Sequence, residues 1–322
     1  MNQSFFDQSD YTPNTAIVTA GHVVIDQVID TIDQEKPRIS LGGPSSYSSV
    51  VLKSLGYQSF VITKVGSDFP KIYSDFLKER GGFNPERVKV SSCKTTSYKI
   101  DRTTSPRRMW LLAKCKPLTF HDFEPVLEIL EHSREKTLIL NPVAGEISLS
   151  LLDRISKEFE FVLVDSQGFV RRISPRTSEV TIKQGLDISS LSGVNVLKAD
   201  REEIAGWTGS TDLEKSIIEI SKFVDTILLT SGPGEVDVYV GGKKVYRATP
   251  PEVASKDTTG AGDIMLACFA ARYSETKDIE RALSFAVCAA SLAVRKVGIE
   301  KSLLTKAEVL KRARDTKIAI CR

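Results

Sequence analysis

Short apolar runs alternate with helix-like segments along most of this chain, and the alternation limits the folds that it can adopt. Successive parallel strands need a long crossover, which is usually a helix. The pattern therefore predicts an α/β fold with a mainly parallel central sheet that is covered by helices on both faces. The predicted strands are 16–20, 57–63, 137–140, 161–164, 194–198 and 226–230, and the predicted helices are 45–55, 69–80, 124–132, 148–158, 213–223, 260–272, 279–296 and 306–314.

Several further β segments do not follow this alternation. One lies at 23–29, and two lie at 95–100 and 107–112, on either side of a Thr-Thr-Ser-Pro turn; two more short strands are predicted at 236–240 and 244–247. We expect a flexible tail at residues 1–15, followed by a single domain at 16–322 with a small β-lid formed from about 22–41 and 95–113.

The bulk composition excludes several classes of function. The net charge is only +3, from 44 Lys plus Arg and 41 Asp plus Glu, which argues against a nucleic-acid partner. No apolar stretch approaches the length of a membrane span, and the N-terminus does not resemble a signal peptide. The five cysteines are scattered and odd in number, so a reducing compartment, the cytoplasm, is expected. The arginines of Arg102–Arg108 suit a solvated loop better than an anion site.

The segment from Asp257 to Asp263 reads Asp-Thr-Thr-Gly-Ala-Gly-Asp and opens an apolar helix. Gly260, Ala261 and Gly262 bring backbone amides to a helix N-terminus with almost no side-chain bulk, which favours a phosphate. A carboxylate at Asp263 would repel that phosphate, so a role as a base that deprotonates an attacking hydroxyl explains it better. The alternative is a glycine-rich turn in which Asp263 only caps the helix.

This segment resembles the C-terminal signature of the PfkB, or ribokinase-like, carbohydrate kinases. A second segment, from Gly42-Gly43-Pro44 to Val65-Gly66-Ser67-Asp68, is similar to the family's other signature, and the resemblance extends from about Ala16 to Gly298. It implies a ribokinase-like fold whose β-lid closes over a sugar. It also implies that Asp263 is the catalytic base, that Gly260 to Gly262 form an anion hole, and that Gly42, Gly43 and Asp26 contact the acceptor.

The same resemblance implies an ATP site and a magnesium ion. Thr230-Ser231-Gly232 is similar to the family's T-x-G segment, although Glu235 stands where a second glycine is usual. Leu197 to Glu203 resembles an L-K-x-N-x-x-E segment in which Asp200 replaces the asparagine, and Glu203 is the implied magnesium residue. The implied nucleotide-binding residues are Lys198, Asp200, Thr230, Gly232, Asp257, Thr258 and Thr259. For Glu202 and Glu203 the alternative is that they are ordinary first-turn helix acids.

Local motifs on the acceptor side resemble the inositol kinases of this family. They are Tyr47 after the glycine pair, the G-H-x-x-x-D opening from Gly21 to Asp26, and Gln167 with Arg171 in a Q-G-F-x-R spacing. Gln167 offers donors and an acceptor and Arg171 a fork of donors, which suits a ring of hydroxyls. His22 is a further candidate for this pocket. Alternatively, residues 165–169 form a plain strand-to-loop turn and Arg171 lies on the surface.

Three hypotheses follow. The first is an ATP- and Mg²⁺-dependent kinase of a sugar or polyol, with myo-inositol the favoured acceptor. The second is a nucleoside kinase or a sugar-acid kinase of the 2-keto-3-deoxygluconate type, and the third is a catalytically silent protein that binds sugars or nucleotides. A small-molecule substrate is the expected partner, with no nucleic acid and no membrane, and pairing of two lids leaves a homodimer open.

Overall fold

The computed structural model describes residues 15–30, 37–83, 88–104, 107–133, 135–232 and 234–321. The expected flexible tail thus lies outside the described residues except for its last member, Thr15, at which the first strand begins.

A large sheet forms the centre of the molecule. Within the described residues it has nine strands in the order β17-β16-β15-β14-β13-β10-β9-β1-β4. The strands from β14 to β4 pair in parallel, while β15, β16 and β17 pair antiparallel at one edge. The strands are β1 (Thr15–Ala20), β4 (Ser59–Ile62), β9 (Glu135–Leu140), β10 (Phe161–Asp165), β13 (Val196–Asp200), β14 (Thr226–Thr230), β15 (Val236–Val240), β16 (Lys243–Thr249) and β17 (Lys317–Ile320).

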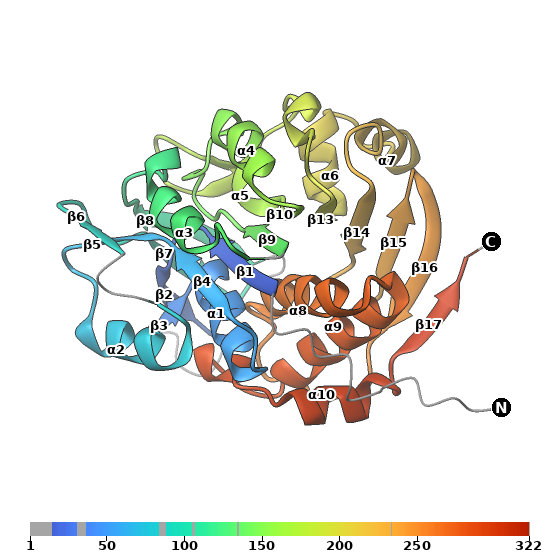
Figure 1. Cartoon of the computed structure of the whole chain (residues 1–322). Coiled ribbons are helices and arrows are strands. Elements are labelled where there is room, and N and C mark those ends of the chain that lie inside the picture. The colour runs from blue at the N-terminus through green and yellow to red at the C-terminus, as the bar shows by residue number, and fades with distance from the viewer. Residues whose placement is uncertain are drawn as a thin grey trace.

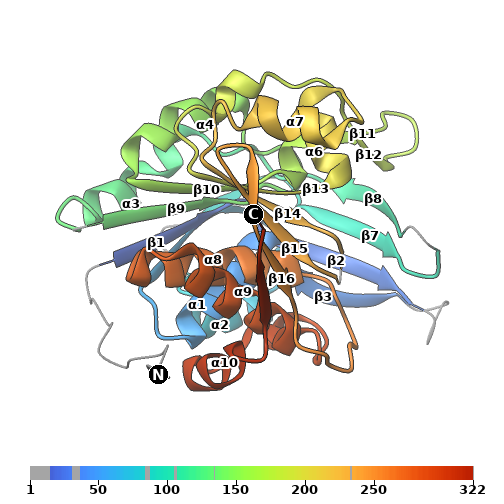
Figure 2. The same ribbon diagram turned by 90° about the vertical axis from the view of Figure 1, so that its right-hand side faces the viewer.

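Helices cover both faces of this sheet, as the two orientations in Figure 1 and Figure 2 show. The parallel strands are apolar on both faces because each face is buried. On one face lie α1 (Pro44–Ser54), α2 (Lys71–Arg80), α8 (Ala261–Thr276), α9 (Ile279–Ala293) and α10 (Lys306–Ala313). On the other lie α3 (Glu124–Ile129), α4 (Leu149–Ile155), α6 (Arg201–Thr208) and α7 (Leu213–Ile220). This architecture confirms the predicted fold class.

A second, smaller sheet projects from one end of the central sheet (Figure 2). Its order is β3-β2-β7-β8, from β2 (Val24–Ile29), β3 (Arg38–Gly42), β7 (Ser97–Asp101) and β8 (Arg108–Ala113). These strands come from the two segments that the sequence assigned to a lid. Along β2, alternate residues are buried, which places Val24, Asp26 and Val28 on the inner face.

Some elements were not predicted. The short pairs β5 (Lys64–Gly66) with β6 (Lys89–Ser91) and β11 (Arg171–Ile173) with β12 (Val180–Ile182) have only three residues per strand, too few for a readable period. Helix α6 has mixed polarity, the four-residue α5 (Gln167–Val170) is a single turn, and β17 is largely exposed at the sheet edge. Short 3₁₀ segments lie at η1 (Phe120–Asp122), η2 (Ser156–Glu158), η3 (Ile188–Leu191) and η4 (Ile299–Ser302). None of the described helices has the length and apolar character that crossing a membrane would require.

Candidate active site

A cavity of about 150 Å³ lies under the lid, next to the start of α8. Residues from the lid, from α1, from α5 and from the turn before α8 line it, so four distant parts of the sequence meet there. Of the residues predicted from sequence, those that line this cavity are Asp26, Gly43, Tyr47, Gln167, Arg171, Lys198, Thr258, Thr259, Gly260, Gly262 and Asp263.

A larger cavity of about 680 Å³ adjoins the first one. Among the predicted residues it is lined by Lys198, Thr230, Gly232, Thr258, Ala261 and Gly262. Much of its remaining wall is apolar, with Val236, Val253, Met265, Val287 and Val294. Four residues line both cavities: Arg107, Lys198, Thr258 and Gly262. The two cavities therefore meet at the glycine turn that opens α8.

The turn before α8 has a shape that needs glycine. Gly260 is the N-cap of α8 with φ of 78°, in the left-handed region. A Cβ at Gly260 would lie 2.7 Å from the ring of Tyr47, so the aromatic ring packs directly on the turn. The amide of Ala261 donates to the carbonyl oxygen of Thr258 at 3.2 Å. The other amides of the first turn have no acceptor within a helix, which leaves the N-terminus of α8 suited to an anion.

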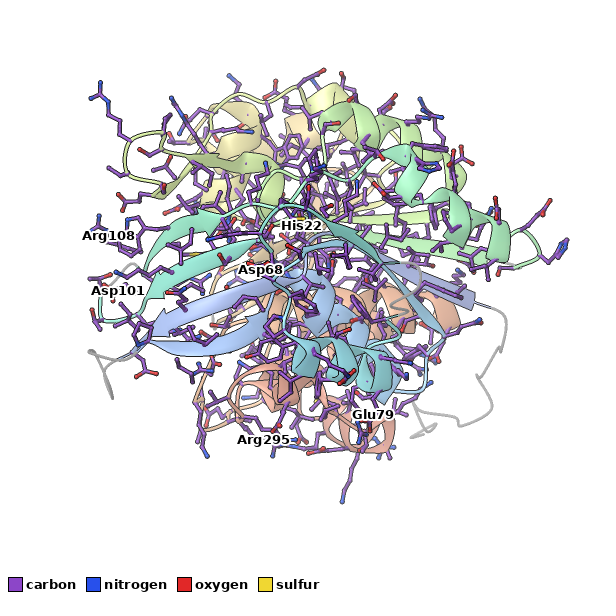
Figure 3. All side chains as sticks on the ribbon, turned by 90° about the vertical axis from the view of Figure 1, so that its left-hand side faces the viewer. His22, Asp68, Glu79, Asp101, Arg108 and Arg295 are labelled. Carbon is purple, nitrogen blue, oxygen red and sulfur yellow. The ribbon has the colours of Figure 1, made fainter. Side chains whose placement is uncertain are left out.

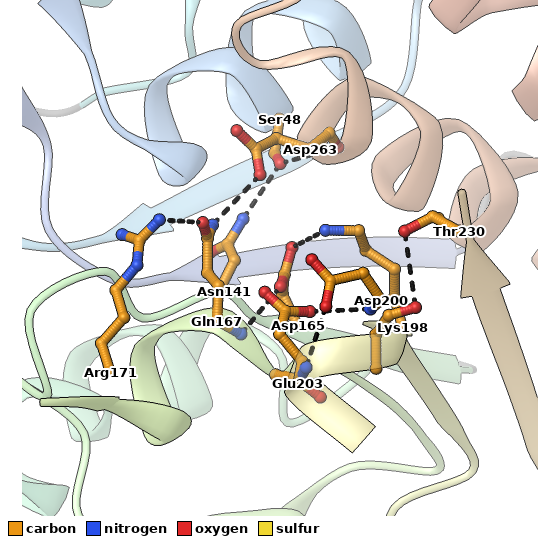
Figure 4. Close-up of polar contacts among 12 residues, drawn as sticks. Ser48, Asn141, Asp165, Gln167, Arg171, Lys198, Asp200, Glu203, Thr230 and Asp263 are labelled. Atoms are coloured by element: carbon orange, nitrogen blue, oxygen red, sulfur yellow. Dashed lines mark hydrogen bonds and ion pairs between the residues drawn. The ribbon is translucent and has the colours of Figure 1, made fainter. Parts of the chain in front are cut away.

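Asp263 lies in the first turn of α8 and faces a polar network (Figure 4). Gln167 Nε2 donates to Asp263 Oδ1 at 3.4 Å, and Arg171 in turn donates to Gln167 Oε1 at 2.8 Å. Burial raises the pKa of Asp263 to about 6, and the nearby charge of Asp165 adds to this, whereas Lys198 and Arg171 oppose it. A carboxylate with such a pKa is ionised at neutral pH and is poised to accept a proton.

Lys198 lines both cavities. It lies in β13 next to Asp165, the last residue of β10, and the two are register partners in the parallel sheet. Lys198 Nζ is 2.7 Å from Asp165 Oδ2, and the same ammonium would be 3.0 Å from a Cβ at Gly262. The structure thus holds a positive charge against the glycine turn, where a phosphate would need one.

Asp26 reaches the smaller cavity from the inner face of the lid. Its burial raises its pKa to about 7, an effect that Arg171 and the lid arginines partly oppose. Gly42 does not line this cavity, contrary to the expected acceptor contact, because it lies behind Asp26: a Cβ at Gly42 would be 1.9 Å from Asp26 Oδ2. Gly42 therefore makes room for the carboxylate, while Gly43 lines the cavity itself.

Asp257 differs from its predicted role at a nucleotide. It lines neither cavity, and its carboxylate faces cations of the protein: Arg102 donates to Oδ1 at 2.6 Å, and Lys301 Nζ lies 2.9 Å from Oδ2. Burial alone would raise the pKa of Asp257, but the hydrogen bond and charge of Lys301 outweigh burial and hold the pKa well below its usual range. Asp257 is thus part of the support beneath the glycine turn.

Asp200 and Glu203 form a capping box at the start of α6 and line neither cavity. The amide of Glu203 donates to Asp200 Oδ1 at 2.8 Å, and the amide of Asp200 donates to Glu203 Oε2 at 3.0 Å. For Glu203, this is the first-turn helix acid that the sequence offered as an alternative. Thr230, at the end of the neighbouring strand, donates to the carbonyl of Ala199 at 3.4 Å. Burial raises the pKa of Glu203 to about 8, although Lys198 opposes the shift. Across the described residues, no three His, Cys, Asp or Glu side chains form a ready metal site.

Two residues of the site were missed from sequence, and one candidate lies elsewhere. Arg107 is exposed, as expected for a solvated loop, but it also lines both cavities. Its neighbour Arg108 lies at the exposed tip of the lid (Figure 3). Asn141 Nδ2 donates to Ser48 Oγ at 3.0 Å, which links the end of β9 to α1 beside Asp263. His22, a candidate for the acceptor pocket, is instead wholly buried between Thr96 and the carbonyl of Lys116 (Figure 3).

Comparison with known proteins agrees with this geometry. Residues 158–306 match the family model described as pfkB family carbohydrate kinase. That match includes the Asp257–Asp263 segment, β10, β13 and β14. Residues 158–306 thus carry the features of a PfkB-family carbohydrate kinase domain, and the described residues adopt a ribokinase-like fold.

Individual relatives are distant but match most of the chain. It is 23% identical over 300 residues to the bifunctional protein HldE of Nitratiruptor sp., covering 88% of this chain but 60% of that protein. A pyrophosphate-dependent kinase in the ribokinase family, complexed with a pyrophosphate analog and myo-inositol, is 27% identical with a TM-score of 0.72, covering 88% of this chain and 98% of the other. A fructokinase with bound ATP from Xylella fastidiosa is 17% identical with a TM-score of 0.73, covering 93% and 98%; it bears on the fold alone.

Proposed function

We propose that this protein transfers the terminal phosphoryl group of ATP to a hydroxyl of a sugar or polyol. The observation that carries the proposal is the meeting of two cavities at the start of α8, with Asp263 facing the smaller one. An acceptor in that cavity would place its hydroxyl between the Asp263 carboxylate and the glycine turn. Asp263 would then accept the hydroxyl proton while the turn amides and Lys198 stabilise the charge of the transferred phosphoryl group.

The donor cavity favours a nucleotide over pyrophosphate. At about 680 Å³ it exceeds the space that a small inorganic anion needs, and its valine, proline and methionine walls suit the flat apolar surface of a base. Thr230 and Gly232 lie on its polar side. The similarity to a pyrophosphate-dependent kinase makes pyrophosphate the donor to test against ATP.

Magnesium belongs to this proposal. Mg²⁺ usually binds through one or two carboxylates together with water and substrate phosphates, so a cage of protein ligands is not needed. Glu203, which lines neither cavity but lies near Lys198, is the carboxylate that would hold the ion, through water. Once bound, the ion would supply neutralisation of the donor's phosphate charge.

Myo-inositol is the acceptor that we favour. The smaller cavity has a volume suited to one ring, and Asp26, Gln167 and Arg171 line it with donors and acceptors for several hydroxyls. A buried carboxyl with a pKa of about 7, like that of Asp26, can accept from or donate to a hydroxyl. The similar pyrophosphate-dependent kinase was complexed with this compound.

A sugar-acid kinase is the second candidate. Two guanidinium groups, those of Arg107 and Arg171, line the acceptor cavity. Such a pair is suited to a carboxylate on the acceptor, because arginine binds carboxylates through two parallel hydrogen bonds.

A coupled assay with Asp263→Asn tests the proposed reaction. With ATP and pyrophosphate as donors, and with myo-inositol, ribose, fructose, adenosine and 2-keto-3-deoxygluconate as acceptors, we expect turnover with ATP and a polyol. The Asp263→Asn enzyme should lose about 10²–10⁴-fold in kcat while its Kd for ATP, measured by calorimetry, changes little. Asp153→Asn, in an exposed ion pair with Lys157, is the matched control.

Two outcomes of that assay would contradict the proposal. Full activity of the Asp263→Asn enzyme would remove the base from the mechanism. Binding of sugar or nucleotide without turnover in any combination would identify a silent binding protein instead.

The pH dependence of kcat/KM should show the ionisation of Asp263. Its pKa of about 6 is raised above the usual range, and the base must be ionised to work, so the rate should fall as the pH drops through about 6. Because Asp26 also titrates, at about 7, the Asp26→Asn enzyme is the control and should keep the limb near pH 6. A flat profile from pH 5 to 8 in both enzymes would count against Asp263.

Variants of Gln167 and Arg171 test the acceptor pocket. Gln167→Ala and Arg171→Ala each remove hydrogen-bonding groups that line the smaller cavity, so the acceptor KM should rise by about tenfold while the KM for ATP stays near its original value. Arg172→Ala is the control, because Arg172 is the exposed neighbour on β11. An unchanged acceptor KM in both variants would assign the two residues a structural role.

A homodimer through the lids is part of the proposal. The outer face of the lid exposes Ile39 and Leu112, at 52% and 47%, and large apolar groups exposed on one surface often mark an interface. Light scattering after size exclusion should therefore give twice the 35.5 kDa of one chain, and Leu112→Lys should lower the measured mass. A monomer at all concentrations would exclude this pairing.

A further inference from the structure

A wholly buried lysine lies beneath the glycine turn without lining either cavity. Lys301, in η4, is 0% exposed. Its ammonium lies 2.8 Å from the carbonyl oxygen of Asp257, 2.8 Å from that of Thr259, and 2.9 Å from Asp257 Oδ2. An ammonium has three N–H donors, so these oxygens satisfy all of them. Burial of an ammonium is costly even when it is paired, so an ordinary packing role would be met better by an apolar side chain.

The two carbonyl oxygens that contact Lys301 also fix the direction of backbone amides in the glycine turn. In a trans peptide unit the C=O and N–H groups point in opposite directions. When the carbonyl of Thr259 points at Lys301, the amide of Gly260 therefore points away from it, and Gly260 lines the acceptor cavity. By the same geometry, the carbonyl of Asp257 sets the direction of the amide of Thr258, which lines both cavities.

The Asp257 carboxylate completes the support. It accepts from the amide of Thr259 at 3.0 Å and from the amide of Gly298 at 3.3 Å, and it pairs with Arg102 from the lid side of the molecule. Two carbonyls and one carboxylate around a single positive charge form the kind of oxygen cage that holds a hard monovalent cation. Here the cation is covalently attached to the chain.

We propose that Lys301 is a tethered cation that orients the peptide groups of residues 257–260 for phosphoryl transfer. Lys301 is thus a positioning residue, and this role rests on the proposed kinase function. A second consequence follows from the cage. If the side chain is removed, its oxygens should accept a free monovalent cation, and that ion should restore the orientation of the amides.

The test compares salts at equal ionic strength: choline chloride, ammonium chloride and potassium chloride. The unmodified enzyme should have the same kcat in all three within about twofold, because its cation is built in. Lys301→Ala should lose on the order of 10²-fold in kcat in choline, since small misplacements in a transfer site cost this much. Ammonium or potassium should restore at least about a tenth of the lost rate, and choline is too large to enter.

Two further variants separate this role from loss of packing. Lys301→Met fills the cage with an uncharged chain, so its kcat should stay low in every salt. Lys296→Ala removes an exposed lysine that donates to the carbonyl of Leu303, next to η4, and should behave as the unmodified enzyme. Equal rates for Lys301→Ala and the unmodified enzyme in choline, or equal recovery of Lys301→Ala and Lys301→Met with ammonium, would overturn the proposal.

A stability measurement works without turnover. The Tm of Lys301→Ala should rise in ammonium relative to choline, whereas the Tm of the unmodified protein and of Lys301→Met should not; no cation-specific rise would overturn the cage. If the Lys301→Ala protein does not fold, the kcat of the unmodified enzyme in the two salts still tests the proposal. A kcat at least about tenfold lower in choline than in potassium would show that the required cation is not Lys301. Absence of turnover in the unmodified protein would instead refute the kinase function alone.

Discussion

The ion pair between Lys198 and Asp165 fixes where the candidate site can form. Lys198 in β13 and Asp165, the last residue of β10, are register partners on adjacent parallel strands, and their side chains meet at 2.7 Å. Asp165 is wholly buried, and loss of its partner would leave an unpaired charge at a cost of about 3–5 kcal/mol. The ion pair holds the Lys198 ammonium against Gly262. A positive charge suited to a phosphate therefore lies at the glycine turn.

Charged side chains also connect the lid to the glycine turn. Arg102, which follows β7, pairs with Asp257, and Arg107, which precedes β8, lines both cavities. Asp26 from β2 completes the acceptor side. The lid is therefore more than a cover, because its cations reach the turn that leads into α8. Movement of the lid should thus change the positions of the charged groups that would face the donor.

Much of this arrangement could be predicted from local sequence, and the rest could not for a physical reason. Strand–helix alternation gave the parallel sheet, and the spacing from Asp257 to Asp263 located the turn and the carboxylate facing the cavity. Partners far apart in sequence are invisible to such patterns. Lys301 meets Asp257 across 44 residues and Arg102 meets it across 155, so Asp257 looked like a ligand residue rather than a support. Gly42 was misplaced likewise, because its closeness to Asp26 arises only when β2 and β3 pair.

The balance of charge around Asp263 is compatible with the proposed role of this carboxylate as a base beside a bound phosphate. Burial and Asp165 favour its neutral form, while Lys198, Arg171 and Arg107 favour the charged form, and the outcome is a pKa of about 6. A donor that brings negative phosphates to Lys198 and Arg107 would weaken the effect of these cations on Asp263. The pKa of Asp263 would then rise toward neutrality as the donor binds, which makes the carboxylate a stronger base when an acceptor hydroxyl must be deprotonated. In the proposed reaction, the cations that would bind the donor would thus also couple its arrival to the basicity of Asp263.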